Sequence, residues 1–486
     1  METHAVWRPP QFAWPLLGFV ALLLTWKLFP EKLEGRWELV MPVLIVGAVL
    51  AIRYLWELHP AVTMCGAIAL SVFSGAWSEI GLGNIPLNRL LAVLVICQCV
   101  LRAPGTVHMP RLQLRNVHLL MALTIVYAVG SASAAHTLTT EKGFLALWDT
   151  LGVMPFLLFL VAPAVFSRAR ERELLLITLL GLGAYLGVTA IFEILGPHSL
   201  VFPHYIVEGN ASTPGVLRAG GPFRAAVAEG CATYVCAVAA AIAFNLWRGQ
   251  RRRWLAAAAG LASIAGCFLT LERGVWLAAI LATVAVALAT RAGRRWLAPG
   301  FLIAAIALGG TLALSSTLSN SASERAGDER SIWDRENQIA AGTRMLESKP
   351  LLGFGWNRFP AESRDYYRQP FTYPQTGYVP GIAIGEPQTP QPLHSAYLSY
   401  AVELGLIGAT LWLASFLWAI GEGIFTRGPT ELRPWKLGLI AVAVFVLAVI
   451  AVNPHEPPFA FVIVLTWAGV ALAGGRRIGN ALPASA

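Results

Sequence analysis

An arginine interrupts a long apolar stretch of the sequence and could bind an anion. Glu272 and Arg273 are the only charged residues in a largely apolar stretch that would otherwise run from Trp254 to Ala289, and Gly274 follows them. An Arg at the centre of a membrane helix costs about 2.5–3.5 kcal/mol, so its retention indicates a function or a partner. Its planar guanidinium matches phosphate oxygens. We therefore expect Arg273 to bind an anion; the alternative is a tight turn in which Glu272 and Arg273 neutralise each other.

Two more arginines lie just before an apolar run that starts near residue 226. Arg218 and Arg224 flank a glycine-rich turn, and Glu229 follows them. Together with Arg273 they would form a diphosphate site, and a helix amino terminus after Arg224 would add partial positive charge. The alternative is that Arg218 only extends to the membrane interface.

A histidine stands at the start of a later apolar run. His394 and Ser395 are followed by Gly405 and Gly408. Imidazole changes protonation near neutral pH and could take a proton from an acceptor hydroxyl, an effect worth about 10²–10⁴ in rate. A structural role at a helix entrance is the alternative. The two glycines would allow close helix packing.

Nothing in the sequence indicates a metal ion or a cofactor. The six cysteines lie in apolar runs and are expected to be buried free thiols. There is no Asp-x-Asp pair and no phosphate-binding glycine loop with a following Lys. His198, His204 and His455 could line the site, but their convergence is not evident from the sequence.

Composition identifies the protein class that must position these residues. Of 486 residues, 56% are hydrophobic and 13% are charged, whereas soluble domains carry about 25% charged residues. The net charge of +9 does not indicate nucleic-acid binding, because the basic residues cluster between apolar runs. We predict an all-α, polytopic membrane helix bundle in a lipid bilayer.

Apolar runs of about 20 residues predict about 12–14 transmembrane helices. Basic loops at alternate positions place both chain ends in the cytoplasm, and the first run is expected to be a retained span. Residues 196–226 and 315–394 then form non-cytoplasmic loops. The predicted spans are 14–30, 37–56, 60–77, 85–101, 116–134, 146–166, 173–195, 227–247, 254–271, 274–290, 297–314, 397–422, 437–453 and 458–474.

The second of these loops is large and is expected to contain short helices. Helical periodicity predicts a helix over 331–346, which Pro350 would end. The remainder is rich in Tyr, Pro, Gln and Gly. Its aromatic rings could stack on sugars or could be interfacial belt residues; the tyrosines concerned are Tyr366, Tyr367, Tyr373 and Tyr378.

Four segments in this order resemble the O-antigen ligase and polymerase family of bacterial envelope glycosyltransferases. Residues 218–223 resemble its Arg-x-x-Gly-x-Phe, and Arg273-Gly274 its Ser-Arg-Gly. Residues 350–359 (PLLGFGWNRF) resemble its Pro-Leu-Leu-Gly-x-Gly-x-x-x-Phe, and 394–408 the ligase pattern of His, Asn/Ser/Gln, nine residues and Gly. Two places depart from the family: Glu272 replaces Ser, and residues 224–227 replace Gly-Asn-Pro-Asn or Gly-His-Pro-Asn.

The resemblance implies a metal-independent, inverting transfer from a polyprenyl-diphosphate-linked glycan at the periplasmic face of a bacterial inner membrane. Arg218 and Arg273 would hold the diphosphate, and His394 would position or deprotonate the hydroxyl of a lipid A-core or glycan acceptor. Other substrate-binding candidates are Arg224, Glu272, Glu229, Trp356, Tyr366 and Tyr378. The implied regions are a transmembrane bundle (1–195), a ligase-like catalytic region (196–425) and a hairpin with a cytoplasmic tail (426–486).

Several functions stay open at this point. The histidine pattern favours an O-antigen ligase, but a polymerase or a protein O-oligosaccharyltransferase would share the architecture. A polysaccharide transporter or flippase also has about twelve to fourteen spans. However, no counterpart of the 315–394 loop is evident in the first half of the chain. A scaffold without chemistry would leave the Arg and His residues unexplained.

Overall fold

The structure of the protein is a computed structural model, and it is built from α-helices. The structure describes mainly residues 53–74, 86–101, 112–208, 218–291, 330–366, 393–453 and 458–473, and every regular element in these ranges is a helix. The predicted spans 14–30 and 297–314, and most of 37–56, lie outside the described residues. The predicted all-α membrane fold is confirmed for the part of the chain that is described.

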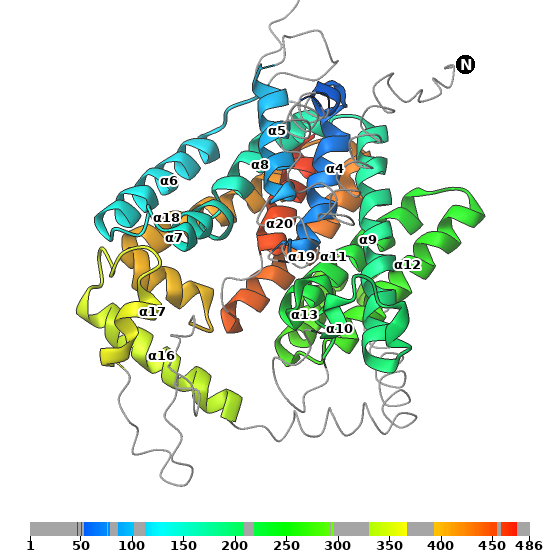
Figure 1. Cartoon of the computed structure of the whole chain (residues 1–486). Helices are drawn as coiled ribbons and strands as arrows, with labels where there is room; N and C mark the ends of the chain where they lie inside the picture. Colours follow the sequence, from blue (N-terminus) through cyan, green and yellow to red (C-terminus); the bar gives the residue numbers. More distant parts are fainter. Residues whose placement is uncertain are drawn as a thin grey trace, which may run out of the picture.

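The elements follow the chain in the order shown in Figure 1. The first half contains α4 (Pro60–Leu70), η1 (Ser71–Phe73), α5 (Leu87–Leu101), α6 (Asn116–Ala134), α7 (Glu141–Leu145), η2 (Ala146–Leu151), α8 (Val153–Val165), α9 (Ala169–Leu195), η3 (His198–Leu200) and α10 (Tyr205–Glu208). The second half contains η5 (Gly221–Phe223), α11 (Ala226–Leu246), α12 (Gln250–Leu269), α13 (Arg273–Ala289), α16 (Arg330–Ser348), α17 (Phe359–Glu362), η6 (Ser363–Tyr366), α18 (Ala396–Phe425), η7 (Thr430–Leu432), α19 (Arg433–Val452) and α20 (Pro458–Leu472).

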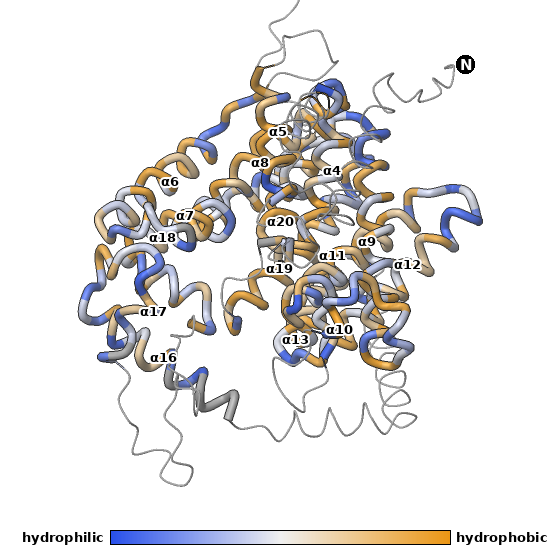
Figure 2. Tube along the Cα trace, viewed as in Figure 1, coloured by the Kyte–Doolittle hydropathy of each residue, from blue (hydrophilic) through white to orange (hydrophobic). Residues whose placement is uncertain are grey.

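Six described helices are long and apolar enough to cross a membrane, and four shorter apolar helices accompany them. The six are Asn116–Ala134, Lys142–Val165, Ala169–Leu195, Ala226–Leu246, Ala396–Phe425 and Thr430–Val452. Large apolar side chains on their outer surface explain why lipid is required. On α6, for example, Leu119, Leu123 and Val126 are 70%, 53% and 68% exposed on one helical face. In Figure 2, much of α6 has the colour of hydrophobic residues.

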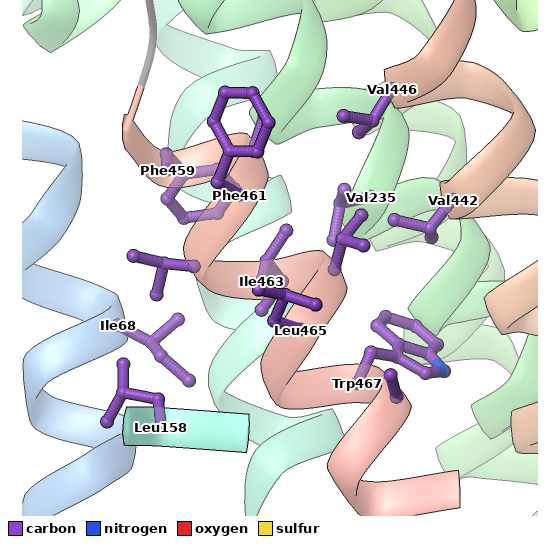
Figure 3. Packing of buried hydrophobic residues seen from close by; sticks show 14 of the residues in the cluster. Ile68, Leu158, Val235, Val442, Val446, Phe459, Phe461, Ile463, Leu465 and Trp467 are labelled. Atoms are coloured by element: carbon purple, nitrogen blue, oxygen red, sulfur yellow. The ribbon is translucent and has the colours of Figure 1, made fainter. Parts of the chain in front are cut away.

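Helix α20 forms the centre of the bundle. Residues 459–473 are all buried, as expected for a helix that is apolar on every side. Figure 3 shows Phe461, Ile463 and Trp467 of α20 among apolar side chains from neighbouring helices, such as Ile68 of α4 and Leu158 of α8. This packed centre fixes the relative positions of the helices around it.

The described part of the large loop packs onto the start of α18. The predicted helix over 331–346 is confirmed as α16, which begins one residue earlier and ends before Pro350. Met345, Phe359, Leu393 and Val402 form a separate buried cluster that joins α16 and α17 to α18. In Figure 1, α16 and α17 lie beside the start of α18. The loop helices are therefore held by apolar packing.

Candidate active site

The glycine-rich turn that carries two of the predicted arginines is fixed by a buried carboxylate. The backbone N–H groups of Gly220 and Gly221 donate to the two carboxylate oxygens of Glu193, at 3.0 and 3.1 Å. Glu193 lies near the end of α9 and is 2% exposed. Both oxygens of one side chain of α9 are used, so α9 determines the position of this turn.

Glu229 lies beneath the same turn. Its side chain is fully buried, and within the described part of the chain its two carboxylate oxygens have no hydrogen-bond partner. Gly221 has φ +52°, and a Cβ at this position would overlap the Glu229 carboxylate. The carboxyl group of Glu229, which was predicted to bind substrate, therefore packs directly against the turn. This contact requires glycine at position 221.

Arg218 lies at the turn between α12 and α13. The N–H of Ala219 donates to the carbonyl of Leu269, the last residue of α12, at 3.0 Å. Two segments about fifty residues apart in the sequence are thereby joined. Arg224 is exposed at the other end of η5, with φ +54°. The backbone bond of Ala219 thus places Arg218 at the α12–α13 turn.

The α12–α13 turn is sharp and is stabilised by an aromatic pair. Leu271 has φ +48°, which breaks the helix. The rings of Phe268 and Trp276 stack across the turn with centroids 5.2 Å apart, and the Trp276 indole N–H donates to the Phe268 carbonyl at 3.2 Å. Arg273 becomes the first residue of α13 and is exposed.

Glu272 connects two arginines, and neither of them is Arg273. One carboxylate oxygen lies 3.2 Å from Nη1 of Arg218, and the other lies 3.6 Å from Nη2 of Arg335. The Glu272 side chain is 8% exposed, whereas Arg218 and Arg335 are 30% and 35% exposed. The simple neutralisation of Arg273 by Glu272 is therefore not what the structure shows.

His394 is held by a glutamine of the same helix that carries Arg335. The Gln338 side-chain oxygen lies 3.1 Å from the backbone nitrogen of His394 and 2.7 Å from its ring Nδ1. Gln338 is fully buried, and His394 is half-buried. The histidine ring is therefore hydrogen-bonded to a side chain of α16.

Helix α16 brings the arginine cluster and the histidine into one region. Arg335 and Gln338 are three residues apart, so they share one helical face with Cβ atoms about 5–6 Å apart. Arg335 contacts Glu272, and Gln338 contacts His394. We call this connection the α16 bridge. It unites Arg218, Glu272 and His394, while Arg273 directly follows Glu272 in the chain.

The segment 350–359 docks into a break in α18. Gly405 has φ +68° and ψ 176° inside the helix, a conformation that is essentially limited to glycine. The freed N–H of Leu406 donates to the carbonyl of Pro350 at 2.8 Å, and the N–H of Gly355 donates to the carbonyl of Glu403 at 2.8 Å. We call residues 350–359 the docked segment.

The Glu403 side chain completes this docking. It is 3% exposed, and its two oxygens accept from the N–H groups of Asn357 at 2.9 Å and Phe359 at 3.2 Å. The two glycines expected to permit close packing thus differ. Gly408 lies against the ring of Tyr127, where a side chain would overlap it, whereas Gly405 creates the break. Docking fixes the end of α16 relative to the start of α18.

Two aromatic residues that were predicted to bind substrate contact other parts of the protein. Trp356 is 1% exposed, stacks on Tyr400 with ring centroids 5.8 Å apart, and donates its indole N–H to the carbonyl of Gly143 at 3.3 Å. Trp356 was expected to contact substrate, but its burial gives it a packing role in the protein core. Tyr366 is half-buried, and its ring meets Phe354 edge to face. Tyr378 lies outside the described residues.

The polar residues of this site contain no evident metal centre. Among the described residues, no group of three or more His, Cys, Asp or Glu side chains could hold a metal ion. Sequence reasoning missed Arg335, Gln338, Glu193 and Glu403. The periodicity of α16 would have placed Arg335 and Gln338 on one face, but it gives no signal for their partners.

A comparison with protein families adds an independent finding. The family model described as O-antigen ligase matches residues 258–413. This range contains the α12–α13 turn, α16, the docked segment, His394 and the break at Gly405. A comparison with curated proteins gives no match to the chain.

Proposed function

We propose that this chain, whose residues 258–413 form a domain of the O-antigen ligase family, is a membrane glycosyltransferase of the ligase type. Its donor is a glycan linked to a polyprenyl diphosphate, and its acceptor is a hydroxyl of lipid A-core. The reaction takes place at the periplasmic face of a bacterial inner membrane, and it needs neither a metal ion nor a cofactor.

The observation that carries this proposal is the α16 bridge. It joins arginines suited to a diphosphate with a histidine suited to a hydroxyl. Arg218, Arg273 and Arg335 are at least partly exposed, and Glu272 pairs with Arg218 and Arg335, so three guanidinium groups lie around this carboxylate. Guanidinium groups bind phosphate oxygens with two parallel hydrogen bonds.

The direction of the helices supports an outer location for the site. Helix α9 has Arg168, Arg170 and Arg172 at its start and ends two residues after Glu193, which holds the glycine-rich turn; it runs from the upper to the lower part of Figure 1. Helix α12 begins with Arg251, Arg252 and Arg253 and ends at the α12–α13 turn. Basic clusters favour the cytoplasmic side, so the site belongs at the opposite ends of these helices.

The proposed reaction is a single displacement at the anomeric carbon of the donor. His394 takes the proton of the acceptor hydroxyl as that oxygen attacks the carbon. The bond between the carbon and the diphosphate oxygen breaks, and the diphosphate leaves with the electron pair. Positive charge on Arg218 and Arg273 stabilises the developing anion, whereas Arg335 contributes to binding of the donor diphosphate. One displacement inverts the configuration, and the proton on His394 later passes to water.

Reconstitution of the purified protein with a polyprenyl-diphosphate glycan and a lipid A-core acceptor tests this function. We expect transfer in the presence of a chelator, with an inverted anomeric configuration. Arg273→Ala and His394→Ala should abolish transfer while the protein stays folded in the membrane. Arg251→Ala, an exposed arginine at the far end of α12, is the matched control and should transfer normally. Wild-type product levels in His394→Ala would reject the role of this residue.

Analysis of cellular glycolipids in a deletion strain separates the ligase from its alternatives. Loss of a ligase leaves finished polymer that is not attached to lipid A-core. Loss of a polymerase instead leaves single repeat units, and loss of a protein O-oligosaccharyltransferase removes protein-linked sugar. Transport of intact substrate into vesicles by the pure protein would support a flippase. The pattern of His394, Ser395, Gly405 and Gly408 favours the first outcome.

A further inference from the structure

One oxygen atom of Gln338 faces two nitrogen atoms of His394. The backbone nitrogen of His394 lies 3.1 Å from this oxygen, and ring Nδ1 lies 2.7 Å from it. A backbone N–H can only donate, which identifies the facing amide atom as the acceptor oxygen. The same oxygen cannot donate to Nδ1, so Nδ1 must carry a hydrogen.

This contact determines which ring nitrogen can act as a base. With a hydrogen on Nδ1, the neutral imidazole has its lone pair on Nε2. When Nε2 takes a proton, the Nδ1–H still donates to the same amide oxygen. The ring can therefore gain and lose a proton at Nε2 without any rearrangement of Gln338.

The position of Gln338 is itself fixed by packing. The residue is 0% exposed. One turn later on α16, Gly342 lies so close to the 393–398 segment that a Cβ would be 2.5 Å from Cδ1 of Leu393 and 3.1 Å from Cδ2 of Leu398. A glycine there lets α16 approach the entrance of α18 closely, and a buried amide in such a contact has little rotational freedom.

We propose that Gln338 is a positioning residue that fixes the Nδ1–H tautomer of His394 and directs Nε2 toward the acceptor hydroxyl. This inference rests on the function proposed above. It follows the arrangement in which a nucleophile is activated by a base and the base is oriented by a third group. The orienting group here is a neutral amide, which adds no negative charge beside a departing diphosphate.

Three charged groups on the elements around His394 have partners other than residue 338. On α16, Arg335 pairs with Glu272 at 3.6 Å, and Arg344 donates to the carbonyl of Tyr366 at 2.9 Å. On α18, Glu403 accepts two backbone N–H groups of the docked segment. None of these three contacts involves residue 338, so a change in pH dependence after substitution of Gln338 reports on the 338–394 contact.

Two substitutions separate orientation from simple structural support. Gln338→Leu removes the acceptor and should lower kcat about 10- to 100-fold, with the donor KM changed by no more than about twofold. Gln338→Glu keeps the shape and adds a negative charge that favours the imidazolium. It should move the acid limb of the pH profile of kcat upward by about one unit or more. Gln98→Leu is the control, because Gln98 is also a fully buried glutamine in a helix. Its side chain donates to the backbone carbonyls of residues 55, 56 and 58. The pH profile of kcat of the Gln98→Leu variant should match that of the wild type.

The results also separate this inference from the proposed function. If His394→Ala is inactive while Gln338→Leu and Gln338→Glu match the wild type in kcat and in pH profile, Gln338 has no orienting role and the proposed function stands. If His394→Ala retains full activity, both are refuted. If Gln338→Leu fails to fold, the pH profile of Gln338→Glu decides: an upward shift supports the inference, and an unchanged limb overturns it.

Discussion

The break in α18 makes a sharp prediction about Gly405. Its backbone lies at φ +68° and ψ 176°, and a Cβ there would overlap the backbone carbonyl of Leu351 in the docked segment. Gly405→Ala should therefore strain the helix and push the docked segment away. Because this segment directly follows α16, the change should also disturb the α16 bridge.

The size of the effect follows from the contacts that would be lost. A non-glycine residue in this backbone region costs about 1–3 kcal/mol. Displacement of Pro350 and Leu351 alone removes the bonds from the N–H groups of Leu406 and Ile407 to their carbonyls, at 2.8 and 3.4 Å. Each is worth about 0.5–1.5 kcal/mol. The total expected loss of stability is about 2–6 kcal/mol.

Thermal unfolding in detergent, followed with a thiol-reactive dye, measures this loss. Cys65, Cys231, Cys236 and Cys267 are free and buried, so they react only as the bundle opens. The control is Gly421→Ala in the same helix, where a Cβ would meet nothing closer than 3.9 Å. It should leave stability unchanged or raise it by up to about 1 kcal/mol. Equal melting of the Gly405→Ala and Gly421→Ala variants would refute the proposed role of the break.

Three further substitutions test separate parts of the site. Arg335→Ala should raise the donor KM about 10-fold and change kcat little, because it removes one cation from the diphosphate site. Steady-state kinetics at varied donor concentration measures both constants. An unchanged KM would exclude Arg335 from donor binding. Trp356→Ala should lower stability by about 3–5 kcal/mol, as expected for a fully buried Trp; a melting temperature equal to that of the wild type would contradict its packing role. Gly221→Ala should abolish transfer, because a Cβ would overlap Glu229 and displace the turn that carries Arg218; normal transfer would show that the turn can adapt.

Sequence patterns with a short range predicted much of this structure. The periodicity over 331–346 predicted α16, and the charged break in an apolar run predicted the α12–α13 turn. Both signals are local, because a helix is defined by neighbours three and four residues apart. The apolar runs predicted the membrane helices for the same reason.

Partners of polar side chains could not be predicted in this way. Pairing of Glu272 with Arg273 was the alternative that the sequence offered, yet the partners of Glu272 are Arg218 and Arg335, both more than fifty residues away. Gln338 contacts His394 from a similar distance along the chain. Such pairs depend on how helices pack. Trp356 illustrates the same limit, because an aromatic residue in a loop motif gives no sign of whether it faces a substrate or a core.

The central claim is that the arginines bind the donor diphosphate and that the histidine takes the proton of the acceptor hydroxyl in the same site. Measuring donor binding and the chemical step separately tests this claim most directly. The measurement is donor affinity and single-turnover rate on the same reconstituted preparations of the wild type, Arg273→Ala and His394→Ala. We predict that Arg273→Ala loses donor affinity, whereas His394→Ala binds the donor normally but transfers at least about 100-fold more slowly. Normal donor binding by Arg273→Ala, or normal single-turnover transfer by His394→Ala, would contradict this division of roles.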